Sequence, residues 1–154
     1  MSNSANGLQQ AGSAIYAVIQ SLIDSQEALV EVGEKLSDQQ LRHFFLAESL
    51  KRAEFRGELE TVLNQEGVGH VRESDIVSGS VQRALSGLRS RLREAGDHTL
   101  LATAEQGEDA AKVAYDNAIS AIPLMPIRNL LTSQASHIQE SHDVLKAALK
   151  RIAA

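Results

Sequence analysis

Apolar residues recur every three or four positions along most of the chain, the spacing that marks one buried face of an α-helix. One stripe of such residues covers residues 8–36 and a second covers residues 41–63. A third covers residues 101–122, and a fourth runs from about residue 127 to residue 152. The pattern therefore predicts four long helices.

Short polar segments and prolines mark where these helices should begin and end. Ser37 and Asp38 lie between the first two stripes and supply an N-cap for the second helix. Because this connection is short, the first two helices should form an antiparallel hairpin. Asp97 is the expected cap of the third helix, and Pro123 and Pro126 should end it.

The segment 67–96 separates the two predicted hairpins. Its first part has no helical pattern, whereas residues 81–96 read as a short amphipathic clip helix. Two hairpins joined by a long connection form the ferritin-like arrangement. We therefore predict one all-α domain over residues 1–154, a ferritin-like antiparallel four-helix bundle whose long crossover contains a short extra helix. Residues 1–8 are expected to be flexible.

Composition agrees with an all-helical protein and narrows its chemistry. The 154 residues contain no cysteine, only two prolines and 3% aromatic residues, so thiolate metal sites and disulfides are excluded. A net charge of -5 argues against non-specific nucleic-acid binding. The N-terminal segment has no targeting pattern, and no apolar run approaches the roughly 18 residues of a membrane span. We expect a cytoplasmic protein without an integral membrane segment.

Polar residues interrupt every stripe near the middle of its helix. Since the helices of a bundle lie side by side, these residues should meet at one height, where an unpaired buried charge costs several kcal/mol. The interrupting residues are Ser25, Gln26, Glu48, Lys51, Arg52, Glu105, Glu108, Gln134, Ser141 and His142.

A carboxylate-bridged di-iron or di-manganese centre is one candidate for this polar layer. Such a centre needs a Glu-x-x-His pair on each of two helices. The sequence has none, because Glu48 is followed at the third position by Lys51, and Glu105 by Glu108. We therefore assign no catalytic residue, metal ligand or cofactor. A degenerate di-metal or mononuclear metal-binding oxidase stays open as the alternative, with Glu48, Glu105, Glu108 and His142 as its residues.

A salt-bridged network is the preferred interpretation of the same residues. Glu48 and Glu108 would pair with Arg52 or Lys51, and Gln134 would act as a neutral bridge between them. A cation supplied by the protein replaces the charge that a metal would bring. Such a network sets the helix register and performs no chemistry.

The remaining candidate residues are interpreted as structural or solvent-exposed and not as parts of a site. His137 and His142 lie about 140° apart around one helix, so they should not share a metal, and we read them as surface or interface residues. His43, His70 and His98 are given no role. The basic residues of the clip helix favour a solvated face, and docking to an anionic surface stays open. They are Arg83, Arg89, Arg91 and Arg93.

Taken together, several segments resemble a family of uncharacterised bacterial four-helix-bundle proteins of the ferritin-like superfamily, known as a domain of unknown function. The segments are LIDSQEAL, FFLAESLKRAEFRGEL, the Gly79-Ser80 pair, EQGEDAAKVAYDNAI and SHDVLK. The resemblance implies a ferritin-like fold and a possible association with stress responses. It implies no established activity and no catalytic residue.

The expected function is that of a non-catalytic structural or interaction protein that self-associates, most simply as a homodimer. This expectation rests on apolar stripes that contain pairs of adjacent apolar residues and are therefore wider than a single buried helix face. The additional apolar side chains have to be covered by another surface. The wide points are the neighbouring pairs Val18 and Ile19, Phe44 and Phe45, and Leu130 and Leu131.

Overall fold

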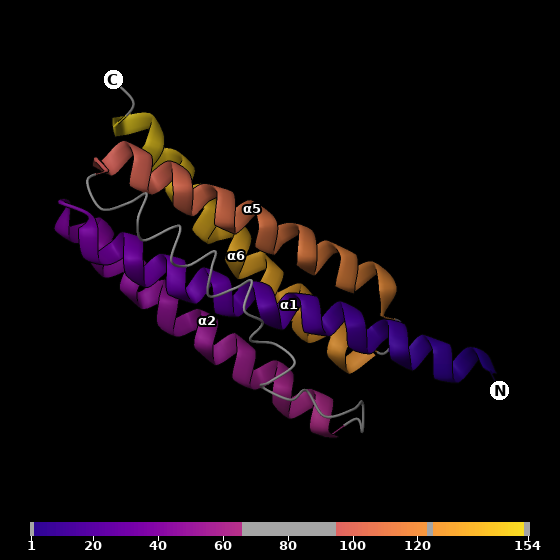
Figure 1. The fold of residues 1–154 in the computed structure, drawn as a ribbon. Coiled ribbons are helices and arrows are strands. Elements are labelled where there is room, and N and C mark those ends of the chain that lie inside the picture. Colours follow the sequence, from indigo (N-terminus) through magenta and orange to yellow (C-terminus); the bar gives the residue numbers. More distant parts are fainter. Residues whose placement is uncertain (1, 66–94, 123–124, 153–154) are drawn as a thin grey trace.

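A computed structural model of the chain describes residues 2–65, 95–122 and 125–152. These residues form four helices: α1 (Ser2–Lys35), α2 (Gln39–Gln65), α5 (Asp97–Ala121) and α6 (Met125–Ile152), which lie side by side along one long axis (Figure 1). No strand occurs among the described residues. The predicted all-helical class and the four long helices are confirmed.

The observed helix ends differ from the predicted ends at three places. Helix α1 begins at Ser2 and not near Leu8, and α6 begins at Met125 and not near Ile127. Pro126 therefore lies in the first turn of α6, where its missing N–H leaves no helical hydrogen bond unmade. Gly96 is the N-cap of α5, so the assignment of that cap to Asp97 was wrong.

The link between α1 and α2 also fixes the start of α5. The backbone N–H of Leu41 donates to Asp38 Oδ1 at 3.1 Å, which confirms Asp38 as the cap of α2. The Ser37 hydroxyl donates to Asp97 Oδ2 at 2.6 Å, and the Ser37 N–H donates to Asp97 Oδ1 at 3.1 Å. Asp97 thus holds the beginning of α5 beside the beginning of α2 (Figure 1).

Each helix packs against specific neighbours. Helix α1 packs extensively against α2 and α5, α5 packs against α6, and α2 and α6 touch more sparsely. Gly33 marks a close approach of α1 to α2, because a Cβ atom placed there would lie 3.0 Å from the Cβ of Phe45. Helix α1 therefore lies between α2 and α5 and packs against both of them.

The core follows the predicted stripes closely. Val18 and Ile19 are both fully buried within the chain. Leu130 packs from a half-buried position against the apolar cluster that contains them, and Phe44 packs in the same way against a second cluster. Much of the apolar width that suggested self-association is therefore covered inside the bundle. Core residues taken from the stripes include Ile15, Leu22, Leu29, Val32, Leu36, Leu41, Phe45, Phe55, Leu59, Leu63, Leu101, Ala104, Ala111, Tyr115, Ala118, Ile122, Ile127, Leu131, Ile138, Leu145 and Ala148.

Two predictions fall on parts of the chain that the structure does not describe. Residues 67–94 of the expected crossover and clip helix lie outside the described residues, and so do Arg83, Arg89, Arg91 and Arg93. Within the described helices, none is long and apolar enough to cross a lipid bilayer.

Candidate functional site

Buried polar residues divide the core into two apolar clusters. One cluster contains Ile15, Phe55 and Tyr115, and the other contains Leu29, Phe45 and Leu145. All four helices contribute to the polar layer between them, as the interrupted stripes predicted. Its buried members are Ser25, Glu48, Ser49, Arg52, Glu108, Gln134, Ser141 and His142.

Arg52 lies at the centre of this layer and is completely buried. Its Nη2 atom donates to Glu108 Oε2 at 2.8 Å, to Glu48 Oε2 at 3.3 Å and to the Ser141 hydroxyl at 3.3 Å. We call these four residues the Arg52 cage. Because one guanidinium joins side chains from α2, α5 and α6, the salt-bridged network predicted from the sequence is present, with Arg52 as its cation.

His137 extends the cage toward the surface. Its Nε2 atom lies 2.9 Å from Glu48 Oε1 and 3.1 Å from Glu48 Oε2, so α6 is tied to α2 at a second point. The imidazole also meets the Phe55 ring edge to face, at 5.4 Å between centroids. His137 is therefore a half-buried partner of a buried carboxylate, a role that its interpretation as a surface or interface residue did not include.

Gln134 belongs to a separate hydrogen-bonded group. It accepts a hydrogen bond from the Tyr115 hydroxyl at 2.8 Å and donates to the backbone carbonyl of Phe55 at 3.2 Å. Burial raises the pKa of Tyr115 well above its ordinary value, which keeps the hydroxyl a donor. Gln134 thus does not bridge the carboxylates, and Lys51 pairs instead with Glu54 at 3.3 Å. The predictions that Lys51 could be the cation of the network and that Gln134 bridges its carboxylates were therefore wrong.

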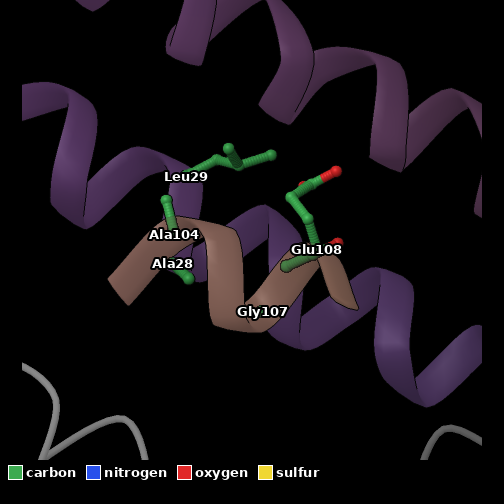
Figure 2. A pocket seen from close by; sticks show the side chains of 6 residues that line it. Ala28, Leu29, Ala104, Gly107 and Glu108 are labelled. Carbon is green, nitrogen blue, oxygen red and sulfur yellow. The ribbon is translucent and has the colours of Figure 1, made fainter. Parts of the chain in front are cut away.

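Burial has the largest effect on the pKa of the Glu108 carboxyl group. Removal from water raises the pKa of its carboxyl group, the charge and hydrogen bond of Arg52 lower it, and the charge of Glu48 raises it again. A cavity of about 10 Å³ lies beside Glu108, lined by Ala28 from α1 and Gly107 from α5 among others (Figure 2). A space of that size admits about one water molecule, so nothing larger fits beside this carboxylate.

His142 stands in a second, neighbouring group. It is 5% exposed, and its Nε2 atom lies 2.9 Å from Asp109 Oδ1 and 3.6 Å from Glu105 Oε1. Neither ring nitrogen has a partner in hydrogen-bonding geometry among the described residues. We call Glu105, Asp109 and His142 the His142 cluster. His142 is buried, as its place in the predicted polar layer implies, and it does not lie on the surface of the described bundle.

The structure therefore divides the four residues of the metal-oxidase alternative into two pairs. Glu48 and Glu108 are held by Arg52, whereas Glu105 and His142 belong to the His142 cluster. Asp109 completes that cluster but was not singled out from the sequence. Its position four residues after Glu105 was the available signal, since residues four apart share one face of a helix.

The other candidate residues take no part in either group. His43 and His98 are exposed, and His70 lies outside the described residues. Asp24 on α1, which is not one of these candidates, also belongs to neither group: partial burial raises the pKa of its carboxyl group, and a hydrogen bond from Gln20 lowers it. Among the candidate residues that the structure describes, those in contact with one another belong to the Arg52 cage, with His137 beside it, or to the His142 cluster.

Comparisons with known proteins give a family without an assigned role. No curated protein matches the chain. The model of a domain of unknown function, DUF2383, matches residues 10–121. That range includes Glu48, Arg52 and Glu108, whereas α6 with Ser141 and His142 lies beyond it. Since the match covers well over half of its length, the chain belongs to the DUF2383 family.

Proposed function

We propose that this protein is a non-catalytic, ferritin-like four-helix bundle that works as a structural or interaction protein. The Arg52 cage is the observation that carries the proposal. A fully buried guanidinium 2.8 Å from Glu108 and 3.3 Å from Glu48 already supplies positive charge to both central carboxylates. A metal ion between them would have to displace Arg52 or accept its repulsion.

The arrangement of the helices supports the ferritin-like part of the proposal. Helix α1 lies between α2 and α5, and α6 contacts both α5 and α2. Helices α2 and α5 begin at the same end of the bundle, where Ser37 and Asp97 are hydrogen-bonded. Two consecutive helices that begin at one end need a connection as long as the bundle, which is the feature that distinguishes ferritin-like bundles from those with short loops only.

The size of the central cavity supports the non-catalytic part. Binding sites for small molecules occupy roughly 300 Å³ or more. The space beside Glu108 is about 10 Å³ and is walled by α1 and α5. A substrate would have no room at the centre of the described bundle, so the polar layer is better suited to fixing the helix register than to chemistry.

Self-association is the interaction we propose, with a second copy of the chain as the partner. Its support lies in three large apolar side chains that remain exposed within the described bundle. They are Leu50 on α2, Val113 on α5 and Val144 on α6. A symmetric dimer is the simplest assembly that would cover such residues.

The mass of the untagged protein in solution tests self-association directly. We expect light scattering at micromolar concentration to give twice the mass of one chain. Replacing Leu50, Val113 and Val144 by glutamine, one at a time, should reduce that mass at the position that lies in the interface. Ala147→Gln is the matched control, because Ala147 is also exposed on α6. A monomeric wild-type protein would contradict the proposal of a dimer.

Metal-dependent oxidation is the alternative function, and a separate assay addresses it. We expect iron(II) oxidation by oxygen or peroxide to proceed at the rate of buffer alone when the protein is present. Turnover that disappears in Glu108→Ala but persists in Asp116→Asn would support the oxidase and contradict a non-catalytic role. The cytoplasmic location and the association with stress remain predictions from the sequence and the resemblance.

A further inference from the structure

We propose that Glu105, Asp109 and His142 bind a divalent transition-metal ion at the seam between α5 and α6. The inference goes beyond the proposed function and does not depend on it. Its first basis is that three side chains of the types that bind metals converge from two helices, with the candidate ligand atoms all within 4.8 Å of one another.

The second basis is the state of His142. A buried imidazole normally satisfies both ring nitrogens, since an unmade hydrogen bond costs about 1–3 kcal/mol. Here the side chain is buried, and yet neither nitrogen has a hydrogen-bonding partner among the described residues. The Nε2 atom lies 2.9 Å from Asp109 Oδ1 and 3.6 Å from Glu105 Oε1, but neither contact has the geometry of a hydrogen bond.

The two separations from His142 Nε2 to the carboxylates fit the edges of a coordination polyhedron. Imidazole nitrogen and carboxylate oxygen bind a zinc ion at about 2.0–2.2 Å, so that two ligands of one ion lie about 3–3.5 Å apart. The distances from Nε2 to Asp109 and Glu105 are close to this range. The side chain of Asp109 is 60% exposed and that of Glu105 is 25% exposed, so both can adjust without movement of the backbone.

The charges and donor types indicate which ions would bind. Two carboxylates and a neutral imidazole carry a charge of about -2, which a divalent ion neutralises. One nitrogen and two oxygen donors suit zinc, manganese, iron(II) or cobalt(II) rather than the all-oxygen preference of calcium and magnesium. Three protein ligands leave coordination positions for water on the side where Asp109 is exposed.

Titration of the untagged, chelator-treated protein with zinc chloride tests the proposal by calorimetry. We expect one zinc ion per chain. Asp109→Asn removes a charged ligand at an exposed position and should weaken binding by at least about tenfold. Asp116→Asn is the matched control, because Asp116 is an exposed carboxylate on the same helix, and it should bind zinc as the wild type does.

A second readout separates the proposed site from unspecific binding. Cobalt(II) should give visible absorption with the wild type and with Asp116→Asn, and this absorption should be lost in His142→Gln. Circular dichroism establishes whether His142→Gln is folded, and Asp109→Asn keeps the test valid if it is not. Wild-type protein that binds no zinc at millimolar concentration, or that binds it no better than Asp109→Asn does, would overturn the proposal. Zinc is redox-inert, so either result is independent of the oxidase and dimer tests.

Discussion

The Arg52 cage and the His142 cluster are built from neighbouring residues, but they solve the burial of charge in opposite ways. Glu108 and Asp109 are consecutive on α5, and Ser141 and His142 are consecutive on α6. Because consecutive residues of a helix point about 100° apart, one of each pair faces the bundle axis and the next faces the seam. The cage contains its own cation, whereas the cluster has two carboxylates beside an imidazole that makes no hydrogen bond among the described residues. One polar layer can thus contain carboxylates that already pair with a protein cation and, beside them, carboxylates that are available to a ligand.

The largest expected effect on stability comes from removing Arg52, the cation of the cage. Arg52→Ala leaves Glu48 and Glu108 buried without their guanidinium partner, and among the described side chains only the imidazole of His137 remains in an ion-pair contact with Glu48. Removing one partner of a buried ion pair costs about 3–5 kcal/mol. We expect the free energy of unfolding, measured with urea, to fall by about that amount.

Lys51→Ala is the control for this experiment. Lys51 adjoins Arg52 in sequence, but its amine pairs with the exposed Glu54 and lies 5.9 Å from the centre of the Phe55 ring. Surface changes of this kind stay within about 0.5 kcal/mol. A loss from Arg52→Ala as small as that from Lys51→Ala would mean that the cage does not hold the bundle together.

A double-mutant cycle between Arg52 and Glu108 measures how strongly the cage is coupled. Glu108→Gln should destabilise the wild type, because it removes the negative charge that lies 2.8 Å from Arg52 Nη2. In the Arg52→Ala background the same change removes an uncompensated buried charge, so it should cost much less or restore stability. We expect a coupling free energy of about 1–3 kcal/mol in urea unfolding. Additive effects of the two changes would indicate that the two side chains do not interact.

Tyr115→Phe tests whether the hydrogen-bonded part of the layer extends beyond the cage. The change keeps the ring in the core but removes the hydroxyl that donates to Gln134 at 2.8 Å. The Gln134 oxygen is then buried without that donor, which costs about 1–2 kcal/mol. Thermal unfolding of Tyr115→Phe beside the wild type should show the loss. Equal stability of Tyr115→Phe and the wild type would show that the hydrogen bond contributes nothing.

The sequence predicted the helices and the polar layer better than it predicted the partners within the layer. Helical periodicity gave the four helices, and it identified Arg52 and Glu108 as interior positions because each interrupts an apolar stripe. Asp109 was missed because it lies one position outside that stripe and is exposed. The partners of Gln134 and His137 depend on side-chain directions and helix heights that periodicity does not specify, so these contacts were not predicted.

Asp109→Asn in the presence of a chelator has the smallest expected effect. It tests the His142 cluster in the absence of metal. Asp109 is exposed and makes no hydrogen bond with His142, so without metal the free energy of unfolding should change by less than about 0.5 kcal/mol. Asp116→Asn should behave in the same way. A loss above about 1 kcal/mol confined to Asp109→Asn would mean that His142 is charged and forms an ion pair with that carboxylate. In that case the charges of the cluster would neutralise one another within the protein, and the cluster would have no need of a bound ion.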